Sequence, residues 1–258
     1  MDCPSDTVFI LEDVNLFFGS VPILTDVNIT IRQRSITSII GPSGSGKSTL
    51  LRTLNRLNDH YPTFRCTGLV SYCGNSIYDN RNGSVDVSRL RQDIGMVFQK
   101  PCLFPTSIYE NVLFGVKRLK LRPKSEFYEI AETMLRAVFL WDEVKDRLKH
   151  SANELSQGQQ QRLSLARALA CEPKVLLLDE PTASLDPKSS EAIESLILKL
   201  GTRLTVIFVT HHLEQAKQLS ETVIFLSDGC VCEWGGVDAI FSCPDKIMTQ
   251  QYLAGHAS

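Results

Sequence analysis

The chain has 258 residues, of which 43% are hydrophobic and 22% are charged, and its formal net charge is −2. This length predicts one large domain or a core with an elaboration, and the weakly acidic balance argues against a nucleic-acid-binding surface or a polybasic membrane anchor. No apolar run approaches the roughly 20 residues that span a bilayer, and the acidic N-terminus lacks the apolar segment of a signal peptide, so we expect a protein of the cytosol.

The N-terminal part of the chain predicts β-strands. Residues 8–17 and 23–31 are strand candidates, and apolar and polar residues alternate in the second of them. The turn residues Gly19-Ser20 separate the two strands. A third strand is predicted at Ile36–Ile40 and a short fourth one at 68–74. These strands indicate a β-rich beginning to the fold.

The most informative stretch is residues 41–48, which read GPSGSGKS and fit the pattern G-x-x-x-x-G-K-[ST] of a phosphate-binding loop. A helical pattern that includes Leu54 and Leu57 follows it. Glycines let backbone N–H groups turn toward phosphate oxygens, and the helix N-terminus adds a positive dipole end. The motif predicts that Lys47 pairs with the β- and γ-phosphates of a nucleotide and that Ser48 holds Mg²⁺. The expected nucleotide contacts are Gly41, Pro42, Ser43, Gly44, Ser45, Gly46, Lys47, Ser48 and Thr49.

The remainder of the chain predicts helices followed by alternating strands and helices. Residues from about 101 to 170 are mostly helical in pattern, whereas strands at 175–178 and 206–209 alternate with helices, one of which Asp186 caps. Asp228-Gly229 is a hairpin signal. This pattern predicts an α/β fold: a P-loop nucleotide hydrolase core with a mainly parallel sheet, an antiparallel β subdomain and an inserted helical subdomain.

Two acids, Asp179 and Glu180, end the strand at 175–178. The carboxyl end of a strand in a parallel sheet faces the ligand crevice. We therefore expect Asp179 to hold Mg²⁺ directly or through water, and Glu180 to polarise the attacking water. The alternative is a surface pair of acids that caps a strand.

The segment LSQGQ at 155–159 predicts a helix start. Ser156 and Gln159 have the spacing of a capping box, and a capped helix start with a glycine, here Gly158, is a ready anion site. The alternative is an ordinary helix cap without a ligand.

The ordered set of motifs resembles that of the ATP-binding cassette (ABC) family, the ATPase subunits of ABC transporters. In this chain the motifs are GPSGSGKS (41–48), Gln99 in MVFQKP, LSQGQ (155–159), LLLDEP (176–181), SLD (184–186) and His211 in VTHH. The resemblance implies ATP and Mg²⁺ as ligands. It also implies that Gln99, Glu180 and His211 are catalytic and that Ser48, Gln99 and Asp179 surround the metal.

The resemblance also assigns roles that composition and spacing do not. Ser156, Gly158 and Gln159 are implied to contact nucleotide across a homodimer, and Phe18 to stack on adenine; a core phenylalanine is the alternative for Phe18. His212 is the rival of His211. Gln157 replaces the family's usual glycine, and glutamine would be strained there if its φ were positive.

The resemblance to the ABC family implies that residues 1–258 of this chain form a single ABC-type ATPase domain. The β-rich and nucleotide-binding core is expected at about 8–98 and 171–258, and the helical subdomain with the signature motif at about 99–170. Expected partners are a second copy, two integral-membrane permease subunits docked near residues 100–109, and through them a solute-binding protein. Nucleic acid is not expected. The protein is expected at the cytoplasmic face of the cell membrane, as a peripheral subunit.

Closer resemblance, over nearly the whole chain, is to the ATP-binding subunits of bacterial phosphate importers. It rests on stretches such as LLRTLNRLND, VDVSRLRQDIGMVFQKP and SQGQQQRLSLARALACEPKVLLLDEPTASLDP. It implies ATP hydrolysis coupled to the uptake of inorganic phosphate. No physical property of the sequence yields phosphate, so an ABC transporter for another substrate, or a regulatory ATPase of the same family without a membrane partner, stays open. A nucleotide-binding structural protein without turnover is a third class, against which the presence of Glu180 and His211 argues.

Overall fold

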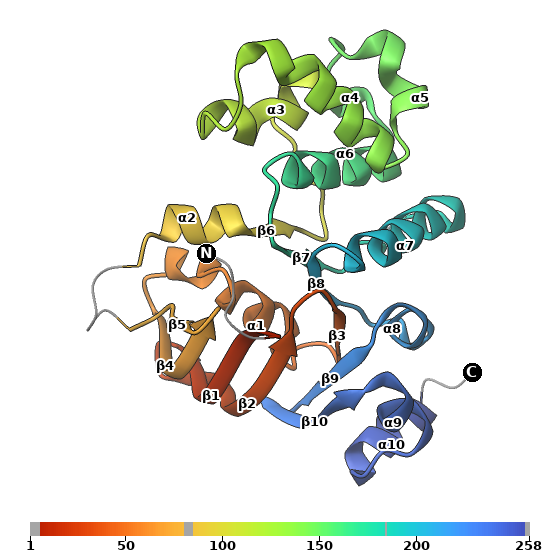
Figure 1. The fold of residues 1–258 in the computed structure, drawn as a ribbon. Helices are drawn as coiled ribbons and strands as arrows, with labels where there is room; N and C mark the ends of the chain where they lie inside the picture. Colours follow the sequence, from red (N-terminus) through yellow and green to blue (C-terminus); the bar gives the residue numbers. More distant parts are fainter. Residues whose placement is uncertain (1–5, 80–84, 184, 256–258) are drawn as a thin grey trace.

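The computed structural model describes residues 6–79, 85–183 and 185–255. In this part of the chain the strands form two sheets (Figure 1). The first is four-stranded and antiparallel, in the order β2-β1-β4-β5. Its strands are β1 (Thr7–Phe18), β2 (Val21–Arg32), β4 (Phe64–Tyr72) and β5 (Asn75–Ser76).

The second sheet is six-stranded, in the order β10-β9-β3-β8-β7-β6, and only β10 runs antiparallel to its neighbour. Every residue of β3, β7 and β8 is buried, as expected for central parallel strands covered on both faces. The strands are β3 (Ile36–Ile40), β6 (Ile94–Val97), β7 (Val175–Asp179), β8 (Thr205–Val209), β9 (Thr222–Ser227) and β10 (Cys230–Gly236).

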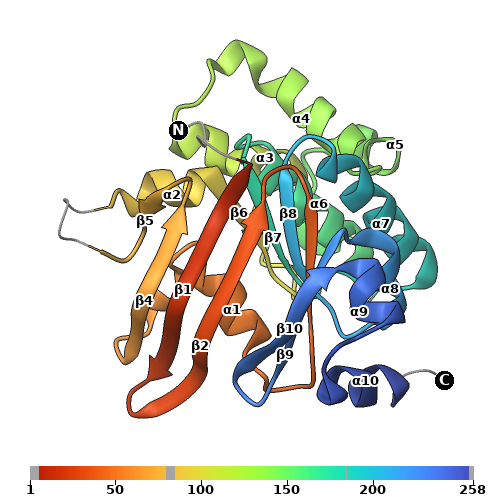
Figure 2. The same ribbon diagram turned by 60° about the horizontal axis from the view of Figure 1, so that its bottom comes forward.

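The two faces of the parallel sheet belong to different cores. Successive side chains of a strand point to opposite faces. Accordingly Val175 and Leu177 pack with helix α1 (Lys47–Thr53) and the antiparallel sheet, whereas Leu176 and Leu178 pack with helix α7 (Pro187–Gly201) and the helices at the top of Figure 1. Figure 2 shows the antiparallel sheet beside the β9–β10 hairpin, with α1 behind it. The loop that precedes α1 packs closely against both sheets: a Cβ at Gly41 would meet Leu226 of β9, and one at Gly46 would meet Leu24 of β2.

Helices α3 to α6 form a group apart from the antiparallel sheet, at the top of Figure 1. The helices of the structure are α1 (Lys47–Thr53), α2 (Val87–Asp93), α3 (Ile108–Arg118), α4 (Phe127–Ala137), α5 (Trp141–Val144), α6 (Gln157–Leu169), α7 (Pro187–Gly201), α8 (Leu213–Leu219), α9 (Val237–Ser242) and α10 (Ile247–Ala254).

The predicted fold class is confirmed, including the parallel sheet, the antiparallel sheet and the helical insertion. The Asp186 cap, whose carboxylate accepts from Ser189 N–H, and the hairpin at Asp228-Gly229 are confirmed as well. The exact limits of the helical subdomain, about 99 and 170, stay a prediction.

Three local expectations were wrong or incomplete. The helix after the phosphate loop ends at Thr53, because Arg56 has a left-handed φ of 59°, and Leu57 begins a separate 3-10 turn, Leu57–His60. The strand expected at 68–74 begins earlier, at Phe64. Neither α2 nor β6 was predicted; β6 pairs with β7 at the sheet edge, a long-range contact that leaves little local signal in so short a strand.

Candidate active site

The loop at 41–46 runs from the end of β3 to the start of α1, and its shape requires glycine. Gly41, Gly44 and Gly46 have φ values of 145°, 81° and 97°. A Cβ at Gly41 would lie 2.0 Å from the carbonyl oxygen of Leu226. The Ser45 hydroxyl is buried and has no hydrogen-bond partner within the described part of the chain. An orphaned buried donor beside a glycine cradle is suited to an anionic ligand.

Lys47 points back into this loop. Its buried Nζ donates hydrogen bonds to the carbonyl oxygens of Gly41 (2.8 Å) and Pro42 (2.7 Å). Burial lowers the pKa of the Lys47 ammonium, while the charges of Glu180 and Asp179 act in the opposite direction. The cation is therefore held next to the loop's own backbone, where a phosphate would lie.

Ser48 and Asp179 meet at the carboxyl edge of the parallel sheet. Ser48 Oγ donates a 2.7 Å hydrogen bond to Asp179 Oδ1, and Asp179 is only 4% exposed. The other carboxylate oxygen, Oδ2, accepts from Arg52 at 3.0 Å. The sequence reasoning missed Arg52, although it lies one helical turn after Ser48 and so on the same face of α1.

Glu180, Gln99 and His211 converge next to Asp179. Glu180 Oε2 accepts a 2.8 Å hydrogen bond from Gln99 Nε2 and lies 3.5 Å from His211 Nδ1. Glu180 has a left-handed φ of 46°, a conformation that costs a residue with a Cβ roughly 1–3 kcal/mol and is typical of functional sites. His212, the rival of His211, packs against it with ring centroids 4.0 Å apart, and burial lowers the pKa of His212.

The signature segment begins helix α6, away from α1 (Figure 1). The predicted capping box is confirmed: Ser156 Oγ accepts from Gln159 N–H, and Gln159 Oε1 accepts from Ser156 N–H. Gln157 is the first residue of this right-handed helix, so its side chain causes no backbone strain. A Cβ at Gly158 would lie 2.5 Å from Ser189 Oγ, which explains the glycine.

The remaining predicted positions have varied surroundings. Phe18 is half-buried, and its ring packs against Tyr61 and Phe64 with centroid distances of 5.4 Å each; adenine stacking stays a prediction. In the SLD segment, Ser184 lies outside the described residues, whereas Asp186 caps α7. The structure thus brings together the phosphate loop, Gln99, Asp179, Glu180 and His211, but it does not bring the signature segment to them within one chain.

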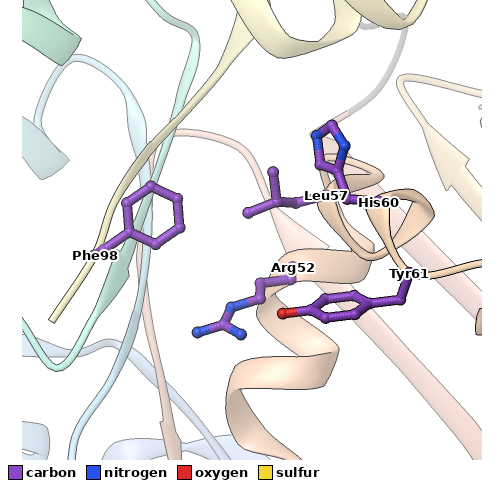
Figure 3. A pocket seen from close by; sticks show the side chains of 5 residues that line it. All are labelled: Arg52, Leu57, His60, Tyr61 and Phe98. Carbon is purple, nitrogen blue, oxygen red and sulfur yellow. The ribbon is translucent and has the colours of Figure 1, made fainter. Parts of the chain in front are cut away.

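A small open cavity adjoins this cluster. Its volume is about 280 Å³, and it is lined by Arg52, Leu57, His60, Tyr61 and Phe98. Figure 3 shows Phe98 facing the other side chains across the opening. Two lining residues are linked to the candidate catalytic residues: Phe98 precedes Gln99 in the chain, and Arg52 pairs with Asp179.

Part of segment 100–109, where the permease contact is expected, is packed inside the protein. Ile108 is buried in the helical core, and the Phe104 ring stacks on Phe114 at 3.9 Å beneath the Arg167 guanidinium. Phe114 is 45% exposed. Phe114 therefore presents an exposed apolar ring next to this segment, whereas Ile108 is buried.

Comparison with known proteins identifies the family. The sequence model described as "ABC transporter" matches residues 24–183. The chain belongs to the ABC transporter family. Proteins named "Phosphate import ATP-binding protein PstB" from Oceanobacillus iheyensis and Pseudoalteromonas translucida are each 46% identical to it over 96% of this chain, and over 89% and 90% of their own lengths.

A solved structure of an ABC transporter protein has a similar fold. The protein cbiO1 from Clostridium perfringens, described as part of the ABC transporter complex cbiONQ, has a TM-score of 0.79 and 29% sequence identity, covering 93% of this chain and 92% of its own. As a member of the ABC ATPase subunits, the chain is an ATP-hydrolysing subunit of a transporter. None of the helices in the described ranges combines the length and apolar character that a membrane crossing requires.

Proposed function

We propose that this ABC ATPase energises the import of inorganic phosphate. The assignment of phosphate as the substrate rests on the relatives named for phosphate import, which align with 96% of the chain. The ATPase chemistry rests on one observation, the convergence of Gln99 and His211 on Glu180 beside the Ser48–Asp179 pair. In this proposal phosphate is recognised by other subunits of the importer, and this chain contacts only ATP, its second copy and the membrane subunits.

Glu180 is proposed as the general base for hydrolysis. Its carboxylate takes a proton from water while the water oxygen forms a bond to the γ-phosphorus. The bond from that phosphorus to the bridging oxygen of the β-phosphate breaks, and ADP and inorganic phosphate result. Gln99 fixes the carboxylate through its 2.8 Å hydrogen bond to Oε2, and His211, whose Nδ1 lies 3.5 Å from the same oxygen, is proposed to contact the γ-phosphate.

Mg²⁺ suits the oxygen atoms at this site. The Ser48 hydroxyl and the Asp179 carboxylate lie 2.7 Å apart, and the amide oxygen of Gln99 is proposed as a third ligand; Mg²⁺ prefers such hard ligands. When bound, Mg²⁺ offsets the negative charge of the β- and γ-phosphates. Lys47 and the buried Ser45 hydroxyl are proposed to contact the same phosphates from the loop.

The signature segment is proposed to act on the ATP of a second copy. In one chain α6 is remote from the phosphate loop (Figure 1), whereas a homodimer places Ser156, Gly158 and Gln159 of one copy over the loop of the other. Each ATP would then be enclosed between two subunits. ATP binding closes the dimer and hydrolysis reopens it, which is how the movement reaches the membrane subunits.

Two permease subunits complete the proposed importer, with a solute-binding protein on their far side. We assign the permease contact to two features, the cavity of Figure 3 and the exposed ring of Phe114 on α3. This association places the chain at the cytoplasmic face of the cell membrane as a peripheral subunit.

Deletion and complementation test the substrate. Removing the gene is expected to impair high-affinity phosphate uptake, and the intact gene but not the Lys47→Ala form is expected to restore it. Normal phosphate uptake in the deletion strain, with loss of uptake of another solute, would reject phosphate as the substrate. The assignment of the chain to a transporter would still hold. Purification without any membrane subunit would favour the regulatory ATPase instead.

A further inference from the structure

Glu143 joins the short helix α5 to the beginning of α6. Its carboxylate accepts two hydrogen bonds, from Arg162 NH1 to Oε1 at 2.7 Å and from Gln159 Nε2 to Oε2 at 2.7 Å. Both donors belong to the first turns of α6. One side chain outside the signature segment therefore contacts α6 at two points.

The contact with Gln159 reaches Ser156. Gln159 Oε1 accepts from the backbone N–H of Ser156 at 3.0 Å, while its Nε2 donates to Glu143. An amide has one accepting and one donating end, so an acceptor at Glu143 determines that the oxygen faces Ser156. If that acceptor is lost, the amide can rotate and the capping box loses one of its two hydrogen bonds.

The contact with Arg162 explains why the carboxylate stays charged. The Arg162 side chain is only 10% exposed, and it also donates to the carbonyl oxygen of Phe139. Partial burial pushes the pKa of the Glu143 carboxyl upward, but hydrogen bonds from Arg162 and Gln159 outweigh it, and the pKa lies below its ordinary value. Glu143 is thus an anion at neutral pH and balances a nearly buried cation.

We propose that Glu143 is a positioning residue for the signature segment, holding the Gln159 amide so that Ser156 keeps the geometry needed for the nucleotide of the second copy. The inference rests on the proposed function, in which Ser156 acts across the dimer. Glu143 does not touch ATP in this proposal. Its effect is therefore expected on dimer formation and turnover, and not on binding of ATP to the phosphate loop of the same chain.

The test introduces Glu143→Gln into the Glu180→Gln protein and measures the dimer dissociation constant with Mg-ATP by analytical ultracentrifugation. A glutamine has only one accepting end, so one of the two contacts becomes donor against donor. Losing a hydrogen bond to a charged group costs roughly 1.5–3 kcal/mol, so we expect the dimer to be about tenfold weaker or more. That expectation for the dimer follows because about 1.4 kcal/mol is tenfold in affinity. ATP affinity of the single subunit is expected to stay within about twofold, because Glu143 contacts Gln159 and Arg162 and not the phosphate loop.

Glu132→Gln in the same background is the matched control. Glu132 also pairs with an arginine of the helical group, Arg136 at 2.7 Å, but it lies on α4. Loss of that exposed pair is expected to leave the dimer unchanged. The comparison separates the position of Glu143 from the general loss of an ion pair in this part of the molecule.

A double variant covers the case in which Glu143→Gln unfolds the protein. Glu143→Leu with Arg162→Met removes the cation that would be left unpaired and leaves Gln159 Nε2 with no acceptor at position 143; we expect the same weakened dimer. Wild-type dimer affinity in either folded variant overturns the inference. If the Glu180→Gln parent itself does not dimerise with Mg-ATP, the proposed function fails, and this inference fails with it.

Discussion

Ser48 Oγ donates a 2.7 Å hydrogen bond to Oδ1 of Asp179, which lies 131 residues further along the chain. Ser48 follows β3 and Asp179 ends β7, and these strands flank β8 in the same direction. Their carboxyl ends therefore meet at one edge of the sheet. The contact places a hydroxyl and a carboxylate oxygen where a metal-bound nucleotide is expected.

Removing the Ser48 hydroxyl is expected to raise the Mg²⁺ requirement. Ser48→Ala deletes one proposed oxygen ligand, whereas Ser48→Thr keeps it. We expect the Mg²⁺ concentration for half-maximal ATP hydrolysis to rise about tenfold or more in Ser48→Ala, as for the loss of one hydrogen bond to a charged partner, and to change little in Ser48→Thr. An unchanged Mg²⁺ titration in Ser48→Ala would exclude Ser48 from the metal site.

Replacing Lys47 is expected to remove productive ATP binding. Lys47→Ala deletes the cation that the loop holds beside Gly41 and Pro42. Hydrogen bonds to charged groups are worth roughly 1.5–3 kcal/mol each, so ATP affinity should fall by about tenfold to a hundredfold in isothermal titration. Lys217→Ala, an exposed lysine of α8, is the control. Equal affinity in both variants would contradict the role of Lys47.

Replacing Glu180 is expected to separate binding from turnover. Glu180→Gln keeps the size of the side chain but removes the proton acceptor, so steady-state hydrolysis should fall by roughly 10²–10⁴-fold while ATP binding remains. The trapped ATP should then hold a dimer together in gel filtration. Glu191→Gln, an exposed residue of α7, is expected to hydrolyse ATP normally. Wild-type hydrolysis in Glu180→Gln would remove Glu180 from its proposed role.

Mixing two inactive variants tests whether the signature segment acts across the dimer. In a mixed dimer of Lys47→Ala and Ser156→Ala subunits, one composite site carries both defects and the other carries neither. Hydrolysis above that of either pure variant is therefore expected. Absence of rescue, with mixed dimers demonstrated by differential tagging, would place Ser156 at the site of its own subunit.

Restoring the family's glycine at position 157 is expected to bring no gain in stability. Gln157 is the first residue of α6 and has an ordinary helical backbone. Glycine in a helix costs up to about 1 kcal/mol relative to alanine, so Gln157→Gly should lower the free energy of unfolding slightly or leave it unchanged. A clear rise in that free energy during urea unfolding would reveal strain at Gln157.

Local features of this protein could be predicted from its sequence because their signals are short-range. The phosphate loop, the capping box of Ser156 and Gln159, and the hairpin at Asp228-Gly229 each depend on residues a few positions apart. The alternation of strands and helices after residue 170 likewise predicted the parallel sheet. The left-handed turn at Arg56, which shortens α1, could not be predicted in this way. No residue near Arg56 signals a positive φ.

Only the tertiary structure decided which distant residues meet. Gln99 and Glu180 are 81 residues apart and Arg52 and Asp179 are 127 apart, yet each pair is in hydrogen-bonding contact. These contacts depend on the order of the strands in the sheet, which hydrophobic periodicity does not encode. The left-handed backbone of Glu180 and the link from Glu143 to the signature segment arise in the same way, because packing of the whole chain selects backbone and side-chain conformations that local propensity leaves open.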